Sequence, residues 1–236
     1  MVEPVDAPAL RQPRARRTRE RILAAAAAEF AVSGYHASSL SRVLQGSKVT
    51  KGALYFHFAS KQDMAIAVME GMEETYQEVA ALARDRVVAD PLRGAAQVSR
   101  DIQDLLSGSV VVRAGRRLAG EGVGGREWAA FPTRFWERVF EEYFAAAKEQ
   151  GLVHDDVDPL ALGRFVTDIS AGSFLNSLAA SEFADLAERV RHNWELMFRA
   201  VATPEWLAGW RAAGGMDAVL GEHLPPPGAA AGRPLL

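Results

Sequence analysis

The chain has 236 residues, of which 49% are hydrophobic and 24% are charged, proportions typical of a globular protein with a substantial core. It contains no cysteine, which excludes disulfides, zinc fingers and thiol nucleophiles. No apolar run approaches the ~20 residues of a membrane span, and the N-terminus lacks the layout of a signal peptide. We therefore expect a cytoplasmic protein.

The net charge of -3 is unevenly distributed along the chain. Residues 1–60 contain nine Lys or Arg and four Asp or Glu, a net charge of +5. The remaining 176 residues contain 18 and 26 of these, a net charge of -8. This asymmetry predicts a polyanion-binding region at one end of the chain. A solvated basic tail would give the same asymmetry, so charge alone does not decide between them.

Every predicted element is a helix, and the expected fold class is all-α. Residues 1–13 contain prolines and lack periodicity, which predicts a disordered arm. A helical pattern begins near Thr18, and Gly34 is placed to end it. The apolar stripe of this first helix consists of Leu23, Ala26, Ala27 and Phe30.

Two short helices with a tight turn between them are predicted next. Ser38 or Ser39 caps the first, and Thr50 opens the second, which runs to about Phe56. Such a pair is the arrangement by which a helix-turn-helix places a recognition helix in the DNA major groove. Ser60, with an acidic residue three positions later, predicts the start of a long fourth helix.

Helical patterns continue to about residue 212, interrupted by a glycine-rich break at 120–127. Further helices are predicted to open at Asp90-Pro91, Pro132, Asp158-Pro159, Glu182 and Pro204. The predicted organisation is a helix-turn-helix DNA-binding domain over 14–60, a larger helical ligand-binding and dimerisation domain over 61–214, and a disordered proline-rich tail over 215–236.

The candidate DNA-binding residues combine positive charge, hydroxyl groups at helix starts and one residue without a side chain. They are Arg14, Arg16, Arg17, Thr18, Ser39, Lys48, Thr50, Lys51, Gly52, Tyr55, His57 and Lys61. Leu54, Phe56 and Phe58 are predicted to be core residues. Taken singly, each candidate is better explained as a solvated surface group, and it is the whole set within a short stretch that points to double-stranded DNA.

The stretch Val49–Phe58, with Gly34-Tyr35, Ser38-Ser39 and Ser60-Lys61, resembles the N-terminal signature of TetR-family transcriptional regulators. The resemblance implies an all-helical homodimer that binds a DNA operator and a small-molecule inducer. The family usually places Ala-Gly directly before Val49, where this chain has Ser47-Lys48. Glycine suits a left-handed turn there, so we expect strain at Lys48, or an altered turn in which Gly46 takes over.

A second resemblance is to the γ-butyrolactone-type autoregulator receptors of actinomycetes. It rests on Val111–Leu118, Phe135-Trp136-Glu137 and Ala171-Gly172, and it implies that Trp136 packs on the ring of the ligand. The other candidate ligand-binding residues are Val110, Phe131, Phe140, Phe174, Thr167, Asp168 and Asn176. Aromatic residues at helical spacing are more often ordinary core. Where such receptors often carry a threonine, this chain has Ile169. The alternative that the protein is a pseudo-receptor, which responds to other molecules such as antibiotic products, therefore stays open.

A coiled-coil-like spacing near the C-terminus predicts a dimer interface. Its residues are Phe183, Leu186, Val190, Trp194 and Met197. Packing within one chain would use the same spacing. The resemblance nevertheless implies a dimer, because two recognition helices must lie about 34–36 Å apart on a two-fold-related site.

No catalytic constellation, metal site or cofactor is expected. Gly120, Gly122 and Gly125 spell G-x-G-x-x-G but follow no strand, and the carboxylates around His154 fit a solvated loop. The expected function is a ligand-responsive repressor of secondary-metabolite genes. The alternatives are a multidrug-responsive repressor of an efflux pump, a ligand-independent DNA binder and an enzyme with an accessory DNA domain.

Overall fold

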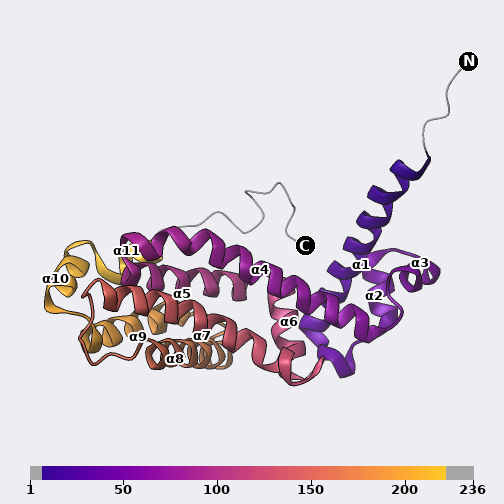
Figure 1. Ribbon diagram of the computed structural model, residues 1–236. Helices are drawn as coiled ribbons and strands as arrows, with labels where there is room; N and C mark the ends of the chain where they lie inside the picture. The colour runs from indigo at the N-terminus through magenta and orange to yellow at the C-terminus, as the bar shows by residue number, and fades with distance from the viewer. Residues whose placement is uncertain (1–6, 222–236) are drawn as a thin grey trace, which may run out of the picture. The chain divides into compact units, whose positions relative to one another are not determined.

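The computed structural model describes residues 7–221 of the chain (Figure 1). The helices are α1 (Ala7–Ala37), α2 (Leu40–Ser47), α3 (Lys51–His57), α4 (Lys61–Ala89), α5 (Pro91–Gly108), α6 (Val110–Gly120), α7 (Gly125–Glu149), α8 (Pro159–Ser181), α9 (Leu186–Val201), α10 (Pro204–Ala212) and α11 (Gly215–Gly221). This confirms the all-α fold class. None of these helices combines the length and apolar character needed to cross a bilayer.

The helices form two compact units. Within the described residues, the first contains Ala7–Thr75 and Gly108–Ala130, and the second contains Tyr76–Ser107 and Phe131–Gly221. The first unit is larger than the predicted 14–60 domain because α6 packs along α1. Its core joins Ala114 and Leu118 of α6 to side chains of α1, α3 and α4.

The first helix begins earlier than predicted. Residues 1–6 of the expected disordered arm lie outside the described range, but from Ala7 onward the chain is helical. The basic stretch after Pro13 consists of good helix formers, and Arg16 pairs with Glu20 one turn later at 2.8 Å. Arg14, Arg16 and Arg17 therefore lie on a helix and not on an extended arm.

The predicted helix starts around the turn are confirmed by their capping hydrogen bonds. The hydroxyl of Ser39 accepts from the Ser41 N–H at 3.2 Å, and that of Thr50 accepts from the Ala53 N–H at 3.2 Å. The hydroxyl of Ser60 accepts from the N–H three residues later at 3.1 Å. These local contacts fix where α2, α3 and α4 begin.

Lys48 itself takes the left-handed conformation that ends α2, with φ 53° and ψ 36°. Gly46 stays inside the helix, so the alternative in which it takes over is wrong. A non-glycine residue in this region costs about 1–2 kcal/mol. The Arg21 guanidinium offsets part of this cost by donating to the carbonyls of Ser47 and Lys48, at 2.5 and 3.1 Å.

Two further helices, α7 and α9, begin at other residues than predicted. The break at 120–127 is shorter than expected, because α7 already begins at Gly125 and contains Pro132 within it. α9 begins at Leu186, since Glu182 and Phe183 both have positive φ and turn the chain first.

The predicted tail at 215–236 is also corrected in part. Gly215–Gly221 forms α11, whose Met216 and Val219 side chains are fully buried. The Arg100 guanidinium of α5 donates to the Val219 carbonyl at 3.3 Å. Residues 222–236 lie outside the described range.

Candidate nucleic-acid interface and effector site

The recognition helix α3 is anchored through two apolar side chains and exposes a polar face. Leu54 and Phe58 are buried in the core of the first unit. Lys51 and Gly52, in the first turn, are exposed, and no atom within 4 Å would meet a Cβ built on Gly52. The helix start thus leaves room for a close approach by a DNA backbone or base edge.

Phe56 is not a core residue, and that prediction is wrong. Its side chain is 81% exposed, beside Tyr55 at 47%. The positions that face inward are Leu54 and, four residues later, Phe58. Phe56 is two residues from each of them, on the opposite side of the helix, and therefore faces outward. The recognition helix therefore presents an apolar ring next to its polar first turn.

The structure divides the other predicted DNA contacts into two groups. Arg14, Arg16, Arg17 and Lys48 are exposed. Thr50 is exposed as the cap of α3, while Thr18 and His57 are half-buried, and the Thr18 hydroxyl donates to the Arg14 carbonyl at 3.0 Å. Ser39 and Lys61 are used within the unit: Ser39 caps α2, and the Lys61 ammonium donates to the carbonyls of Tyr35 and Ser38 at 2.5 and 3.1 Å.

A contact between α6 and the end of α1 was not anticipated from the sequence. Gly34 kinks α1 with φ 71° and ψ -175°. Before the kink, the Arg117 guanidinium donates to the Ala31 and Val32 carbonyls at 3.1 and 2.8 Å. After it, the Glu121 carboxylate accepts from the Tyr35 N–H at 2.7 Å.

Arg117 and Glu121 are themselves paired at 3.1 Å, and we call this ion pair the α6 clamp. Burial alone would raise the pKa of Glu121, but the Tyr35 N–H and the Arg117 charge lower it overall. In the sequence, the signal for this ion pair was the spacing of four residues between Arg117 and Glu121. The clamp holds the segment that leads from α1 into the helix-turn-helix.

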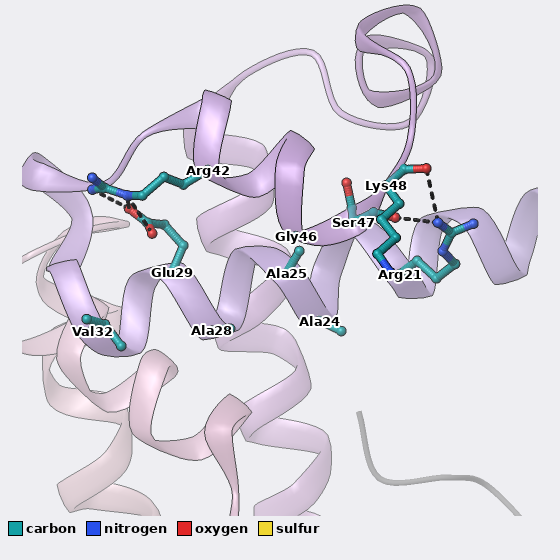
Figure 2. Close-up of a pocket in the computed structure, with 10 residues that line it drawn as sticks. All are labelled: Arg21, Ala24, Ala25, Ala28, Glu29, Val32, Arg42, Gly46, Ser47 and Lys48. Carbon is teal, nitrogen blue, oxygen red and sulfur yellow. Dashed lines mark hydrogen bonds and ion pairs between the residues drawn. The ribbon is translucent and has the colours of Figure 1, made fainter.

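An open groove of about 590 Å³ runs along α1 and α2 (Figure 2). Alanines form its floor, and Figure 2 shows Arg42 reaching Glu29 at one end and Arg21 reaching the end of α2 at the other. Arg42 donates to both Glu29 oxygens, at 2.7 and 2.9 Å, which lowers the pKa of that carboxyl. Because these charged groups already have partners, we assign the groove no ligand.

The second unit contains a buried aromatic cluster around Trp136, which is only 3% exposed. The Tyr76 ring of α4 lies 4.8 Å from the Trp136 ring, and Phe131 stacks on Tyr76 at 6.2 Å. Phe135 completes the cluster. The structure thus brings together two predicted ligand-site residues, Trp136 and Phe131, and adds Tyr76. The sequence signal for Tyr76 was its spacing on α4: it lies seven residues after Met69 and four after Met72, on the same apolar face of the helix.

The six other predicted ligand-site residues make the following contacts, and their role in a ligand site stays a prediction. Val110 packs against the core of the first unit. Phe140 stacks with Phe144, and Phe174 stacks with Phe183. On α8, the Thr167 hydroxyl donates to the Gly163 carbonyl at 2.9 Å, while Asp168 and Asn176 are exposed.

The predicted dimer seam is corrected as well. Leu186, Val190, Trp194 and Met197 are each at most 7% exposed within one chain, and Phe183 is half-buried against Phe174. These side chains are therefore not available to a partner. The exposed apolar side chains of α8 and α9 are Leu160, Phe165, Leu175, Leu178 and Leu196.

An exposed recognition helix on a helix-turn-helix unit, followed by a second helical unit with a buried aromatic cluster, defines a DNA-binding regulator. The family model described as "Bacterial regulatory proteins, tetR family" matches residues 22–68. The chain is 31% identical over 210 residues to the A-factor receptor protein of Streptomyces griseus, covering 88% of this chain and 72% of that protein. The chain belongs to the TetR family of bacterial transcriptional regulators.

Solved structures of similar proteins agree over most of the chain. A γ-butyrolactone receptor, an ArpA-like protein, is 28% identical, with a TM-score of 0.75 over 89% of this chain and all of that one. The TetR-family protein CprB from Streptomyces coelicolor, in complex with its operator sequence, is 28% identical, with a TM-score of 0.69 over 87% and 99% of the two chains. The resemblance to γ-butyrolactone receptors is confirmed.

Proposed function

We propose that this chain is a ligand-responsive transcriptional repressor, which binds a pseudopalindromic operator as a homodimer and is released by a γ-butyrolactone-like signal. The genes it controls would be those of secondary metabolism. The observation that carries the proposal is the buried Trp136–Tyr76 cluster, in a chain that also exposes a recognition helix. The similarity to the A-factor receptor supports the same class of effector.

On the operator, α3 would read base edges with its first turn, while cations on α1 and α2 bind phosphates. Lys51 and Tyr55 are the exposed side chains best placed for this reading, and Gly52 lets the backbone approach. Arg14 and Arg17 are exposed on α1, in the same unit as α3, and supply positive charge there. Each lost phosphate contact would reduce the salt dependence of binding.

The homodimer would form through the exposed apolar face of α8 and α9. Phe165, Leu175 and Leu196 are each at least 50% exposed, and large apolar side chains so placed favour a partner surface. A two-fold interface uses the same patch on both chains. It would bring two recognition helices to one operator, as a pseudopalindrome requires.

Release of DNA requires an effector that binds the two conformations of the dimer with different affinities. α4 is the continuous element between the sites, since it begins at Lys61 and carries Tyr76. Lys61 binds the carbonyls of Tyr35 and Ser38, and the α6 clamp binds the Tyr35 N–H. A shift of α4 or α6 would therefore move the start of the helix-turn-helix.

The proposal is tested by fluorescence anisotropy on a labelled duplex from the chain's own upstream region. Wild-type protein should bind, and an alkanoyl γ-butyrolactone should release it. Trp136→Ala should bind the duplex with wild-type affinity and ignore the lactone, whereas Lys51→Ala should bind weakly with a flatter salt dependence. Release of both wild type and Trp136→Ala would refute the effector site, and release by bulky cationic dyes alone would favour the multidrug alternative.

A further inference from the structure

A stripe of positive charge on α1 has no counter-charge in the part of the chain that the structure describes. The stretch from Arg14 to Arg21 contains five arginines and one glutamate. Arg14, Arg17 and Arg21 lie three and four residues apart, so they share one side of the helix, and none of them is in an ion pair. Arg16 is paired with Glu20 and points away from this stripe, by about 100° or more around the helix.

The stripe continues into the turn between α2 and α3. The Arg21 guanidinium donates to the carbonyls of Ser47 and Lys48, so the exposed Lys48 lies beside it (Figure 2). Both acceptors are uncharged, and these bonds therefore leave the positive charge of Arg21 without a counter-charge. The Lys48 ammonium is in no ion pair with any described residue. We call Arg14, Arg17, Arg21 and Lys48 the α1 ridge.

Lys48 is a costly residue at its position, which is a second and independent observation. Its φ of 53° and ψ of 36° lie in the left-handed region, which glycine occupies without strain. Other residues persist there where the surrounding structure holds them, and they cluster at functional sites. A glycine would keep this turn and remove the strain. What the lysine adds is an exposed positive charge.

The α1 ridge starts next to the recognition helix and leads away from the core. Lys48 stands two residues before Thr50, which caps α3. The buried side chains of α1 begin at Ile22, so the helix before it is not held by the core of the unit. Arg14 is seven residues before Arg21, about 10 Å further along the helix axis. The ridge therefore extends the charged surface well past the start of α3.

A row of cations without counter-charges fits a polyanion whose charges are regularly spaced. Along the axis of duplex DNA, each strand has a phosphate about every 3.4 Å, so the 10 Å arm of the ridge spans roughly three base pairs. The ridge is also continuous with the exposed first turn of α3, in the same unit. Contacts to phosphates position a protein on the duplex and carry no sequence information.

We propose that the α1 ridge binds the phosphate backbone beside the major groove that α3 enters, and that Lys48 occupies its strained position for this charge. This inference rests on the DNA-binding part of the proposed function and does not depend on the effector. It assigns Lys48, Arg14 and Arg17 to affinity and not to sequence preference. Their loss should weaken binding to the operator and to an unrelated duplex by the same factor.

Three variants of Lys48 separate its charge from its strain, with binding measured by fluorescence anisotropy on the labelled duplex. Lys48→Gly removes both and should melt about 2–4 °C above wild type, yet bind about eightfold more weakly at about 0.1 M salt. Lys48→Ala removes only the charge and should bind as weakly, with the melting temperature of wild type. Lys48→Arg keeps the charge and should bind within about twofold of wild type.

Arg17→Ala is tested against its neighbour Arg16→Ala, which changes the net charge equally. Alanine is a good helix former, so α1 should stay helical in both. For Arg17→Ala, as for Lys48→Ala, the slope of log K against log salt should fall by about 0.9, the value for one phosphate. Arg16→Ala should keep the slope and bind within about twofold of wild type. Methylphosphonates, which neutralise one phosphate at a time, should weaken wild type at one or two positions where Arg17→Ala is insensitive.

The outcomes separate this inference from the proposed function. A wild type that binds the duplex, with Lys48→Ala and Arg17→Ala equal to it in affinity and salt slope, would overturn the inference and leave the proposed function standing. A loss on the operator alone would also overturn it, because that loss would mean base readout. Equal weakening by Arg16→Ala would show a general charge effect in place of a ridge. A wild type that binds no duplex would overturn the DNA-binding part of the proposed function, and this inference with it.

Discussion

Gly34→Ala should destabilise the first unit strongly, through two separable effects. The backbone conformation at this kink, φ 71° and ψ -175°, is one that essentially only glycine adopts, which costs another residue about 1–3 kcal/mol. In addition, the new Cβ would lie 2.0 Å from a Glu121 carboxylate oxygen and 2.9 Å from Arg117 Nε. Because that contact is impossible, the carboxylate must leave the Tyr35 N–H.

Loss of this charge-assisted hydrogen bond costs at most about 1.5–3 kcal/mol, and the lower end applies because the Glu121 side chain keeps 27% of its exposure. The sum is about 2.5–4.5 kcal/mol for Gly34→Ala. Urea unfolding followed by circular dichroism measures it. For a chain of this size, that loss corresponds to a melting temperature lowered by roughly 5–18 °C.

A double-mutant cycle with Glu121→Ala separates the two effects. Removing the carboxylate first removes the steric conflict, so Gly34→Ala should then cost only the backbone contribution of about 1–3 kcal/mol. The reasoning is refuted if Gly34→Ala lies within 0.5 kcal/mol of wild type, roughly the error of such comparisons. It is equally refuted if the variant costs the same with and without Glu121.

Three further predictions concern other parts of the chain. Lys48→Gly should raise the free energy of unfolding by about 1 kcal/mol by relieving the left-handed backbone, while Lys48→Ala should not, as urea titrations will show. If the chain forms the proposed homodimer, Leu175→Glu should convert it toward monomer in sedimentation equilibrium, and an unchanged dimer would place the interface elsewhere. Hydrogen bonds from the hydroxyls of Ser177 and Ser181 lower the pKa of Asp185 to about 2 in the folded protein, whereas its value in the unfolded chain is about 3.9. The contribution of Asp185 to stability is therefore complete above about pH 3.9 and is lost as the pH falls toward 2. Asp185→Asn should lack that pH-dependent component, and identical profiles for the two proteins would contradict the assignment.

The helix starts could be predicted from the sequence because caps are local chemistry. Ser39 and Thr50 each satisfy an N–H within three residues, and no distant part of the chain is needed to recognise this. Whether the apolar side of a helix packs within its own chain or against a partner chain could not be predicted in this way. Val190 and Trp194 have the spacing of a dimer seam, yet they pack within their own chain, and periodicity is the same in both cases.

The candidate effector site shows the same limit. Trp136 was found through a resemblance to a family, whereas Tyr76 stands 60 positions earlier and reaches it only through the register of α4 and α7. The exposure of Phe56 was missed because an apolar residue between two core residues, Leu54 and Phe58, is easily taken for a core residue itself. Contacts between distant helices depend on packing, which a pattern along one segment does not contain.

The short helix α11 sets a practical limit on how far the chain can be trimmed. Its Met216 and Val219 fill part of the second unit, and its backbone accepts a hydrogen bond from the buried Arg100. Cutting after residue 214 would leave apolar surface of the second unit and the Arg100 guanidinium uncovered. A protein shortened in this way should be cleaved readily by proteases and should aggregate.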